Sequence, residues 1–196
     1  MQKKRIYAGI GSRDTPEAIC REMTQIAEYL DGRGFTLRSG GARGADDAFE
    51  RGSGNREIYL PENTFNGRRA DRGNCIDASR LPNWIDALAL AERHHPNWAA
   101  VMRSRNAPSL MGRNAYQILG ADLKTPVNFV VCWAENTQFD GQGQICDVDG
   151  GTGLAVRLAY AHQIPVYNLD IPEHRMRILG AIPDPKTQKN GTRIKS

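Results

Sequence analysis

The chain has 196 residues, of which 40% are apolar and 24% are charged, and its 26 Lys and Arg against 22 Asp and Glu give a net charge of +4. This length suits one domain with a sizeable core, and the composition excludes disordered, fibrous and disulfide-stapled proteins. No apolar run approaches the roughly 20 residues of a membrane-spanning helix, so we expect no membrane partner.

The four cysteines give no sign of a metal site. Cys20, Cys75, Cys132 and Cys146 form no CxxC pair, and no histidine lies at zinc-finger spacing from them. The basic N-terminal residues are not followed by the apolar stretch of a secretory signal. Unpaired thiols in such a chain are typical of a reducing compartment, so we expect a cytoplasmic protein without a metal or other cofactor.

The first sixty residues alternate short apolar strands with helices. We expect a first helix from Thr15, as its capping residue, to about Gly32, and a second helix that ends at about Arg51. The strands around these helices are expected at residues 5–10, 35–38 and 57–60. Strand–turn–helix alternation at this short spacing indicates parallel βαβ units.

The alternation continues after residues 62–110, a segment rich in Arg, Asn and Pro in which we expect one helix at 83–92. The apolar residues 127–133 are expected to form a central strand. The other expected elements are a helix at 108–119, a polar loop at 134–149, a helix introduced by the glycines at 150–153 and a strand at 164–168. The sequence therefore predicts a single Rossmann-like α/β domain over residues 1–180, with a doubly wound, mainly parallel sheet and helices on both faces. A basic, flexible tail is expected at 181–196.

Three glycine-containing turns follow predicted strands, at residues 9–13 (GIGSR), 39–46 (SGGARGAD) and 149–153 (DGGTG). Because the carboxyl ends of parallel strands meet at one edge of a sheet, we expect the turns to share a ligand crevice. A helix that starts there offers free N–H groups to a phosphate. The fingerprints GxGxxG and GxxxxGK[ST] are absent. The polar side chains expected to contact the ligand are Ser12, Arg13, Ser39, Arg43 and Thr152.

The motifs GIGSR, SGGARGADDAF, LMGRNAYQILG and DGGTGLAVRLA, in this order over about residues 5–169, resemble those of the SLOG superfamily. This superfamily joins the DNA-processing protein DprA, the Lonely-guy phosphoribohydrolases and the YpsA-related group. The GARGAD motif followed by Arg113 and Asn114 is most similar to the YpsA-related branch. The resemblance implies a Rossmann-like fold that binds a nucleotide or a nucleotide derivative at the strand ends.

The resemblance also implies three parts of a nucleotide site. The first turn would line the base or ribose, the second would approach the ligand closely, and the third would hold a phosphate at a helix start. Arg113 matches an arginine of the phosphoribohydrolases, Asn114 replaces their lysine, and Arg157 stands in the place of their catalytic Glu. The small residues assigned in this way are Gly9, Gly11, Ser12, Gly40, Gly41, Gly44, Gly150, Gly151, Thr152 and Gly153.

The replacement of that Glu leaves the reaction open. Cleavage of an N-glycosidic bond needs a carboxylate to stabilise the developing positive charge or to activate water, and an arginine does neither. We take Arg113, Asp46 and Asp149 as candidate catalytic residues. A helix-dipole role for Asp46 and a turn role for Asp149 are the simpler explanations of each carboxylate. Other acids expected near the same rim are Asp47, Glu135, Asp140 and Asp147.

Two functions fit these residues, and a non-catalytic structural subunit whose glycines are purely conformational is a third alternative. The first is binding of a nucleoside monophosphate or an ADP-ribose-type ligand by a homodimer or higher homo-oligomer, as a sensor, a sequestering protein or an N-glycosidic hydrolase. Trp133 would then stack on the base, with core packing as the alternative. The second is DprA-like binding of single-stranded DNA by the twelve arginines between Arg38 and Arg113. Residues 6–183 carry a net charge of only −2, which favours the small ligand.

Overall fold

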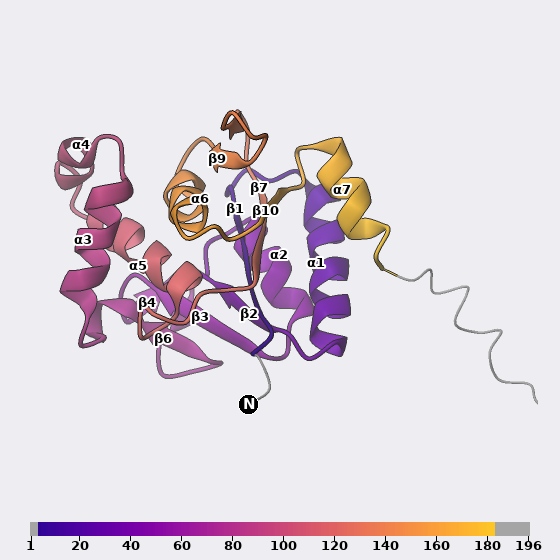
Figure 1. The fold of residues 1–196 in the computed structure, drawn as a ribbon. Helices are drawn as coiled ribbons and strands as arrows, with labels where there is room; N and C mark the ends of the chain where they lie inside the picture. Colours follow the sequence, from indigo (N-terminus) through magenta and orange to yellow (C-terminus); the bar gives the residue numbers. More distant parts are fainter. Residues whose placement is uncertain (1–3, 183–196) are drawn as a thin grey trace, which may run out of the picture.

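Six parallel strands form one sheet in the order β10-β7-β1-β2-β3-β6 in the computed structural model, which describes residues 4–182 (Figure 1). The chain extends the sheet from β1 through β2, β3 and β6, and then returns to add β7 and β10 on the other side of β1. This order confirms the predicted doubly wound, Rossmann-like α/β fold. The strands are β1 (Ile6–Gly11), β2 (Thr36–Ser39), β3 (Arg56–Leu60), β6 (Cys75–Asp77), β7 (Phe129–Trp133) and β10 (Val166–Asn168).

Helices cover both faces of this sheet, as predicted (Figure 1). One face is covered by α1, α2 and α7, and the other by α3, α5 and α6, with the short α4 beside α5. The helices are α1 (Glu17–Gly32), α2 (Ala45–Gly52), α3 (Trp84–His94), α4 (Trp98–Met102), α5 (Ala107–Leu119), α6 (Thr152–Ala161) and α7 (Pro172–Leu179).

Alternate side chains of the two central strands enter the two cores. On β1, Tyr7 packs on the side of α1 and α2, while Ala8 and Ile10 pack on the side of α5 and α6. On β7, Trp133 belongs to the first core and Cys132 to the second. Because both faces of a parallel sheet are buried, such strands have near-continuous apolar sequences, and this is the signal that identified them.

The two central strands end side by side. β1 pairs with β7 over five residues, and the last pair is Gly11 with Trp133. The sheet grows in opposite directions from these two strands, and the helices that follow them, α1 and α6, lie on opposite faces. Open α/β sheets bind their ligands in the crevice at such a switch point, outside the carboxyl ends of the strands.

The predicted N-cap of α1 is wrong. The hydroxyl of Thr15 donates to the carbonyl of Ser12 (2.8 Å) and so closes the turn after β1. Pro16 occupies the capping position, and among the described residues no side chain caps this helix end. A threonine hydroxyl beside a helix start can bond either to the first N–H groups of the helix or to the turn before it, and here it bonds to the preceding turn.

The polar loop expected at 134–149 contains a small hairpin of β8 (Gln138–Phe139) and β9 (Ile145–Asp147). Its turn is closed by the carboxylate of Asp140, which accepts the backbone N–H groups of Gln142 and Gln144, both at 2.8 Å. The side chain of Asn168 on β10 bonds both backbone groups of Ala134 and thereby fixes the start of this segment.

The segment at 62–110 holds more structure than the one predicted helix. After β3 come the hairpin strands β4 (Thr64–Phe65) and β5 (Arg68–Arg69), then β6 at the edge of the sheet, and a 3-10 turn at Ala78–Arg80. Helices α4 and α7 were also not predicted. Strands of two or three residues and the five-residue α4 contain too few positions for a periodic pattern to appear, and the eight-residue α7 has no buried residue and so no apolar face to detect.

Among residues 4–182, no helix is both long enough and apolar enough to cross a bilayer. Of the tail predicted at 181–196, residues 183–196 lie outside the described part of the chain.

The loop between α5 and β7 yields a test of stability against pH. Its Asp122 carboxylate accepts the N–H groups of Lys124 and Thr125 and the hydroxyl of Thr125, and these bonds lower the pKa of Asp122 to about 2. The same loop presents the carbonyl of Thr125 to the buried guanidinium of Arg38 at 2.6 Å. We predict that Asp122→Asn lowers the free energy of unfolding at pH 7 by about 1 kcal/mol, a modest value because the carboxylate is exposed.

This difference is expected to shrink as the pH falls from about 4 towards 2, because the wild-type carboxylate, whose pKa is lowered on folding, then becomes protonated. Urea unfolding of both proteins from pH 7 down to pH 3 measures it. A difference that stays constant with pH would show that the charge of Asp122 contributes nothing.

Candidate ligand-binding pocket

A pocket of about 340 Å³ opens at the carboxyl end of β1, between the first turns of α2 and α6 and the middle of α5. Its position is the switch point between β1 and β7, and its volume lies at the lower end of the range for small-molecule sites. The lining consists of Ile10, Gly11, Ser12, Arg13, Asp14, Ala42, Asp46, Leu110, Met111, Arg113, Asn114, Gln117, Asp149, Gly150, Gly151, Thr152 and Ala155.

This pocket brings together many of the residues that the sequence singled out. They come from all three glycine-containing turns and from α5, so the expectation that the turns share one crevice agrees with the geometry. The predicted residues in the lining are Gly11, Ser12, Arg13, Asp46, Arg113, Asn114, Asp149, Gly150, Gly151 and Thr152.

The other predicted site residues lie outside this lining. Trp133 is buried in the core between the sheet and α1 and α2, which matches the packing alternative. The hydroxyl of Ser39 donates to the carbonyl of Gly9 (2.7 Å) within the sheet. Most of the glycines in this group are required by packing, since an added Cβ would meet another residue at 2.8 Å or less. The remaining residues outside the lining are Gly9, Gly40, Gly41, Arg43, Gly44 and Gly153.

The most unusual group in the pocket wall is the guanidinium of Arg113, which is 7% exposed. Its Nη1 atom lies 3.8 Å from Oδ2 of Asp46, which is 3% exposed, and its central carbon lies 5.5 Å from the ring centre of Phe65. Within residues 4–182, Nε of Arg113 has no hydrogen-bond partner. Arg113 is thus a buried cation of the pocket lining with one donor that the protein leaves unpaired, which is costly unless an anion compensates the charge.

Two amides hold this arginine and the neighbouring glycine turn in place. The amide of Gln117 is oriented so that all of its hydrogen-bonding groups are satisfied. Its oxygen then accepts the N–H of Gly40 (2.9 Å) and Nη1 of Arg113 (3.0 Å), and its nitrogen donates to Oδ1 of Asn114 (3.2 Å). Asn114 in turn donates to the carbonyl of Gly151 at 2.9 Å. The amides therefore link the glycine turn after β2 to the turn before α6 through the middle of α5.

Burial shifts the proton equilibria of the ion pair in opposite directions. It raises the pKa of Asp46, while the charge of Arg113 and the N–H groups of Ala42 and Gly40 oppose that rise. Burial also lowers the pKa of Arg113, which the charge of Asp46 opposes. Because the ordinary pKa of an arginine is so high, Arg113 stays cationic at neutral pH.

The start of α6 forms another part of the pocket wall. Gly151 precedes the helix, and no side chain in the described range caps it. A Cβ added at Gly150 would meet nothing within 4 Å, and one added at Gly151 would meet only Met111 at 3.8 Å. The backbone is thus open to the pocket at a helix N-terminus, where unpaired N–H groups and the helix dipole favour an anion.

The remaining candidate acids have other partners or lie elsewhere. Asp149 lines the pocket but is exposed, and its carboxylate accepts the amide of Asn136 at 2.5 Å. Asp47 pairs with Arg68, and Asp147 pairs with Arg157. Arg157 also donates to the carbonyl of His94 (2.7 Å), so this residue joins α6 to β9 and to the end of α3. Asp140 closes the hairpin turn described above, and Glu135 is exposed outside the lining.

Sequence reasoning missed Gln117 and Leu110, which line the pocket, and Phe65, which contacts Arg113. Leu110, Arg113 and Gln117 follow one another at helical spacing, so the predicted helix could have identified the first two. Phe65 lies on a two-residue strand of a hairpin that the sequence did not reveal. Among the described residues, no group of three or more His, Cys, Asp or Glu side chains is arranged to hold a metal ion.

No protein-family model and no curated protein sequence matches the chain. Among solved structures, one similar chain is DNA processing protein A from Helicobacter pylori, a structure described as giving its single-stranded DNA binding mode. The two chains are 16% identical with a TM-score of 0.49, and the match covers 85% of this chain and 65% of that protein. The chain therefore spans just under two thirds of that protein's length, and the likeness concerns the fold alone.

The close contact between Gly40 and Arg113 provides a test of the pocket wall. A Cβ at residue 40 would lie 1.3 Å from Nη1 of Arg113 and 2.1 Å from the side-chain amide of Gln117, so both buried side chains would have to move. We predict that Gly40→Ala lowers the free energy of unfolding by about 2 kcal/mol, in the range for overpacked sites. Urea unfolding measures the change.

The matched control is Gly32→Ala at the end of α1, where an added Cβ meets nothing within 4 Å. This variant should unfold within about 0.5 kcal/mol of wild type. Equal stabilities for the two variants would contradict the close packing of Arg113 against residue 40.

Proposed function

We propose that the pocket at the switch point binds a small phosphate-bearing ligand of the nucleotide type. The observation that carries the proposal is the guanidinium of Arg113, more than nine-tenths buried on the pocket wall, whose Nε has no partner within residues 4–182. The uncapped N-terminus of α6 lies on the same pocket and supplies backbone donors. An anion in the pocket would be attracted by the charge of Arg113 and would accept hydrogen bonds from the N–H groups at the start of α6.

The other charges of the pocket favour a ligand with hydrogen-bond donors as well as a phosphate. Its lining contains Arg13 and Arg113, but also the carboxylates of Asp14, Asp46 and Asp149. A bare polyanion would be repelled by three acids. A nucleotide combines a phosphate with ribose hydroxyls and base N–H groups that carboxylates can accept.

The site supports binding better than hydrolysis. The resemblance to the SLOG superfamily places Arg157 at the position of the catalytic Glu of the phosphoribohydrolases. Arg157 is paired with Asp147 and lies outside the pocket lining. Asp46 is paired with Arg113, and Asp149 with Asn136. We therefore propose a binding role, as a sensor or sequestering protein of the SLOG superfamily and its YpsA-related branch, with hydrolysis as an outcome that the test below reports.

Single-stranded DNA is the alternative ligand. Arg13 and Arg43 are exposed on the turns after β1 and β2, where a strand passing the pocket would place its phosphates. The net charge of −2 over residues 6–183 disfavours this alternative, because it provides little overall attraction for a polyanion. A cytoplasmic location and a homodimeric or higher state remain predictions.

The test is ligand binding to the wild-type protein and to Arg113→Lys. Lysine keeps the positive charge beside Asp46 but lacks Nε and the planar fork. Titration calorimetry with nucleoside monophosphates, ADP-ribose and inorganic phosphate should find a ligand for wild type whose affinity falls about tenfold or more in the variant. Chromatography of the same mixtures reports any released base.

The matched control is Arg157→Lys, which changes a partly buried arginine of α6 outside the pocket and should bind like wild type. A labelled oligonucleotide, tested at two salt concentrations, covers the DNA alternative, because phosphate-backbone binding weakens steeply with salt. If no small ligand binds, or if both variants lose affinity equally, the proposal is wrong.

A further inference from the structure

The hairpin formed by β4 and β5 lies beside the pocket and depends on the body of the protein for its position. Its turn residues, Asn66 (φ 50°) and Gly67 (φ 77°), have the left-handed conformations of a tight Asn-Gly turn. Each of its strands has only two residues, and so short a hairpin has no independent stability. Contacts with neighbouring elements must therefore hold it.

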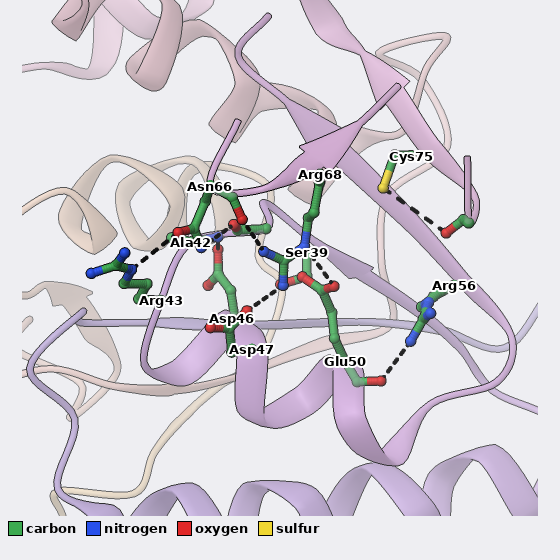
Figure 2. Close-up of polar contacts among 12 residues, drawn as sticks. Ser39, Ala42, Arg43, Asp46, Asp47, Glu50, Arg56, Asn66, Arg68 and Cys75 are labelled. Atoms are coloured by element: carbon green, nitrogen blue, oxygen red, sulfur yellow. Dashed lines mark hydrogen bonds and ion pairs between the residues drawn. The ribbon is translucent and has the colours of Figure 1, made fainter. Parts of the chain in front are cut away.

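The main contact is made by Arg68, which lies across the first turns of α2 (Figure 2). Its Nη2 atom is paired with Asp47, and its Nε atom donates to Glu50 at 3.1 Å. The arginine thus uses both sides of its fork to bridge two carboxylates on one helix. An Arg fork that is partly buried between two acids holds its geometry better than an exposed ion pair does.

The same hairpin touches the groups that form the pocket wall. Asn66 donates to the carbonyl of Gly41 (3.1 Å) and accepts from Nε of Arg43 (3.1 Å), so it contacts the glycine turn after β2 (Figure 2). Phe65, two residues before Gly67, places its ring 5.5 Å from the guanidinium carbon of Arg113. Asp46 precedes Asp47 on the helix that Arg68 holds.

Arg68 also sets the charge beside the pocket. Asp46, Asp47 and Glu50 are three acids on two turns of α2, and Glu50 is 8% exposed with no partner for Oε1 among the described residues. Arg68 is the ion-pair partner of Asp47 and Glu50, just as Arg113 is that of Asp46. Without Arg68, Asp47 would be an uncompensated negative charge next to the Arg113–Asp46 pair, and Glu50, whose pKa burial already raises, would lose the cation that favours its ionised form.

From this geometry we infer that Arg68 is a positioning residue of the pocket: it fixes the hairpin and the start of α2, and it neutralises Asp47 and Glu50 so that Arg113 remains attractive to a phosphate. The inference rests on the proposed function for its effect on ligand affinity. The effect of Arg68 on the titration of Asp46 concerns the protein without ligand, so this part of the inference does not depend on the proposed function.

The experiment compares Arg68→Gln, Arg68→Lys and the matched control Arg69→Gln. Arg69 lies on the same hairpin, but it pairs with the exposed Asp71 rather than with α2. We expect Arg68→Gln to weaken binding of the tightest nucleoside monophosphate by about fivefold or more, Arg68→Lys to recover part of the loss, and Arg69→Gln to bind like wild type.

A second readout needs no ligand. The carboxyl carbon of Asp46, observed by NMR, should titrate at a higher pH in Arg68→Gln than in wild type, because Asp47 and Glu50 then act on it without compensation from Arg68, while Arg113 remains in place. Arg69→Gln should leave the midpoint unchanged. Should Arg68→Gln fail to fold, Arg68→Lys provides the same comparison, with a smaller expected shift.

The outcomes separate the two proposals. Wild type that binds no probe overturns the proposed function, while the Asp46 titration still decides the role of Arg68. Wild type that binds, together with an Arg68→Gln variant of unchanged affinity and unchanged Asp46 midpoint, overturns the positioning role. Equal effects of the Arg68 and Arg69 substitutions would also overturn it, since Arg68 pairs with two carboxylates of α2 whereas Arg69 pairs with Asp71.

Discussion

Arg113 carries a positive charge into the interior, and much of the surrounding structure serves to keep it there. A buried charge is tolerated only when opposite charge and hydrogen-bond partners compensate it. Asp46 on α2, Gln117 on α5 together with Arg113 itself, and Phe65 on the β4–β5 hairpin provide that compensation. Gly40 leaves the space that the guanidinium occupies. The pocket is therefore a consequence of how several separate segments pack around one cation.

The sheet and its helices could be predicted because their physical signals are local. Buried parallel strands such as β1 and β7 are continuous apolar runs, and α1 shows a regular apolar face. The β4–β5 and β8–β9 hairpins escaped prediction because strands of two or three residues have no period to detect. Thr15 misled the prediction because its hydroxyl serves the preceding turn.

The pocket was only partly visible in the sequence for a related reason. Glycine-containing turns that follow parallel strands predict a crevice at the strand ends. The turns that contain Ser12 and Gly151 do line the pocket found there. The sequence does not say whether a glycine faces a ligand or another side chain. Gly9, for example, is packed against Phe49, while Gly150 faces open space. That distinction depends on contacts between residues far apart in the chain.

NMR of the labelled protein can show whether Arg113 and the start of α6 together hold a phosphate. The Nε–H signal of Arg113 and the amide signals of Gly151 and Thr152 are followed while nucleoside monophosphates are added. We predict that these signals shift together and saturate at the same ligand concentration, because one anion contacts both groups. If the ligand binds while the Arg113 signal stays unmoved, or if the shifts appear only elsewhere, the claim is contradicted.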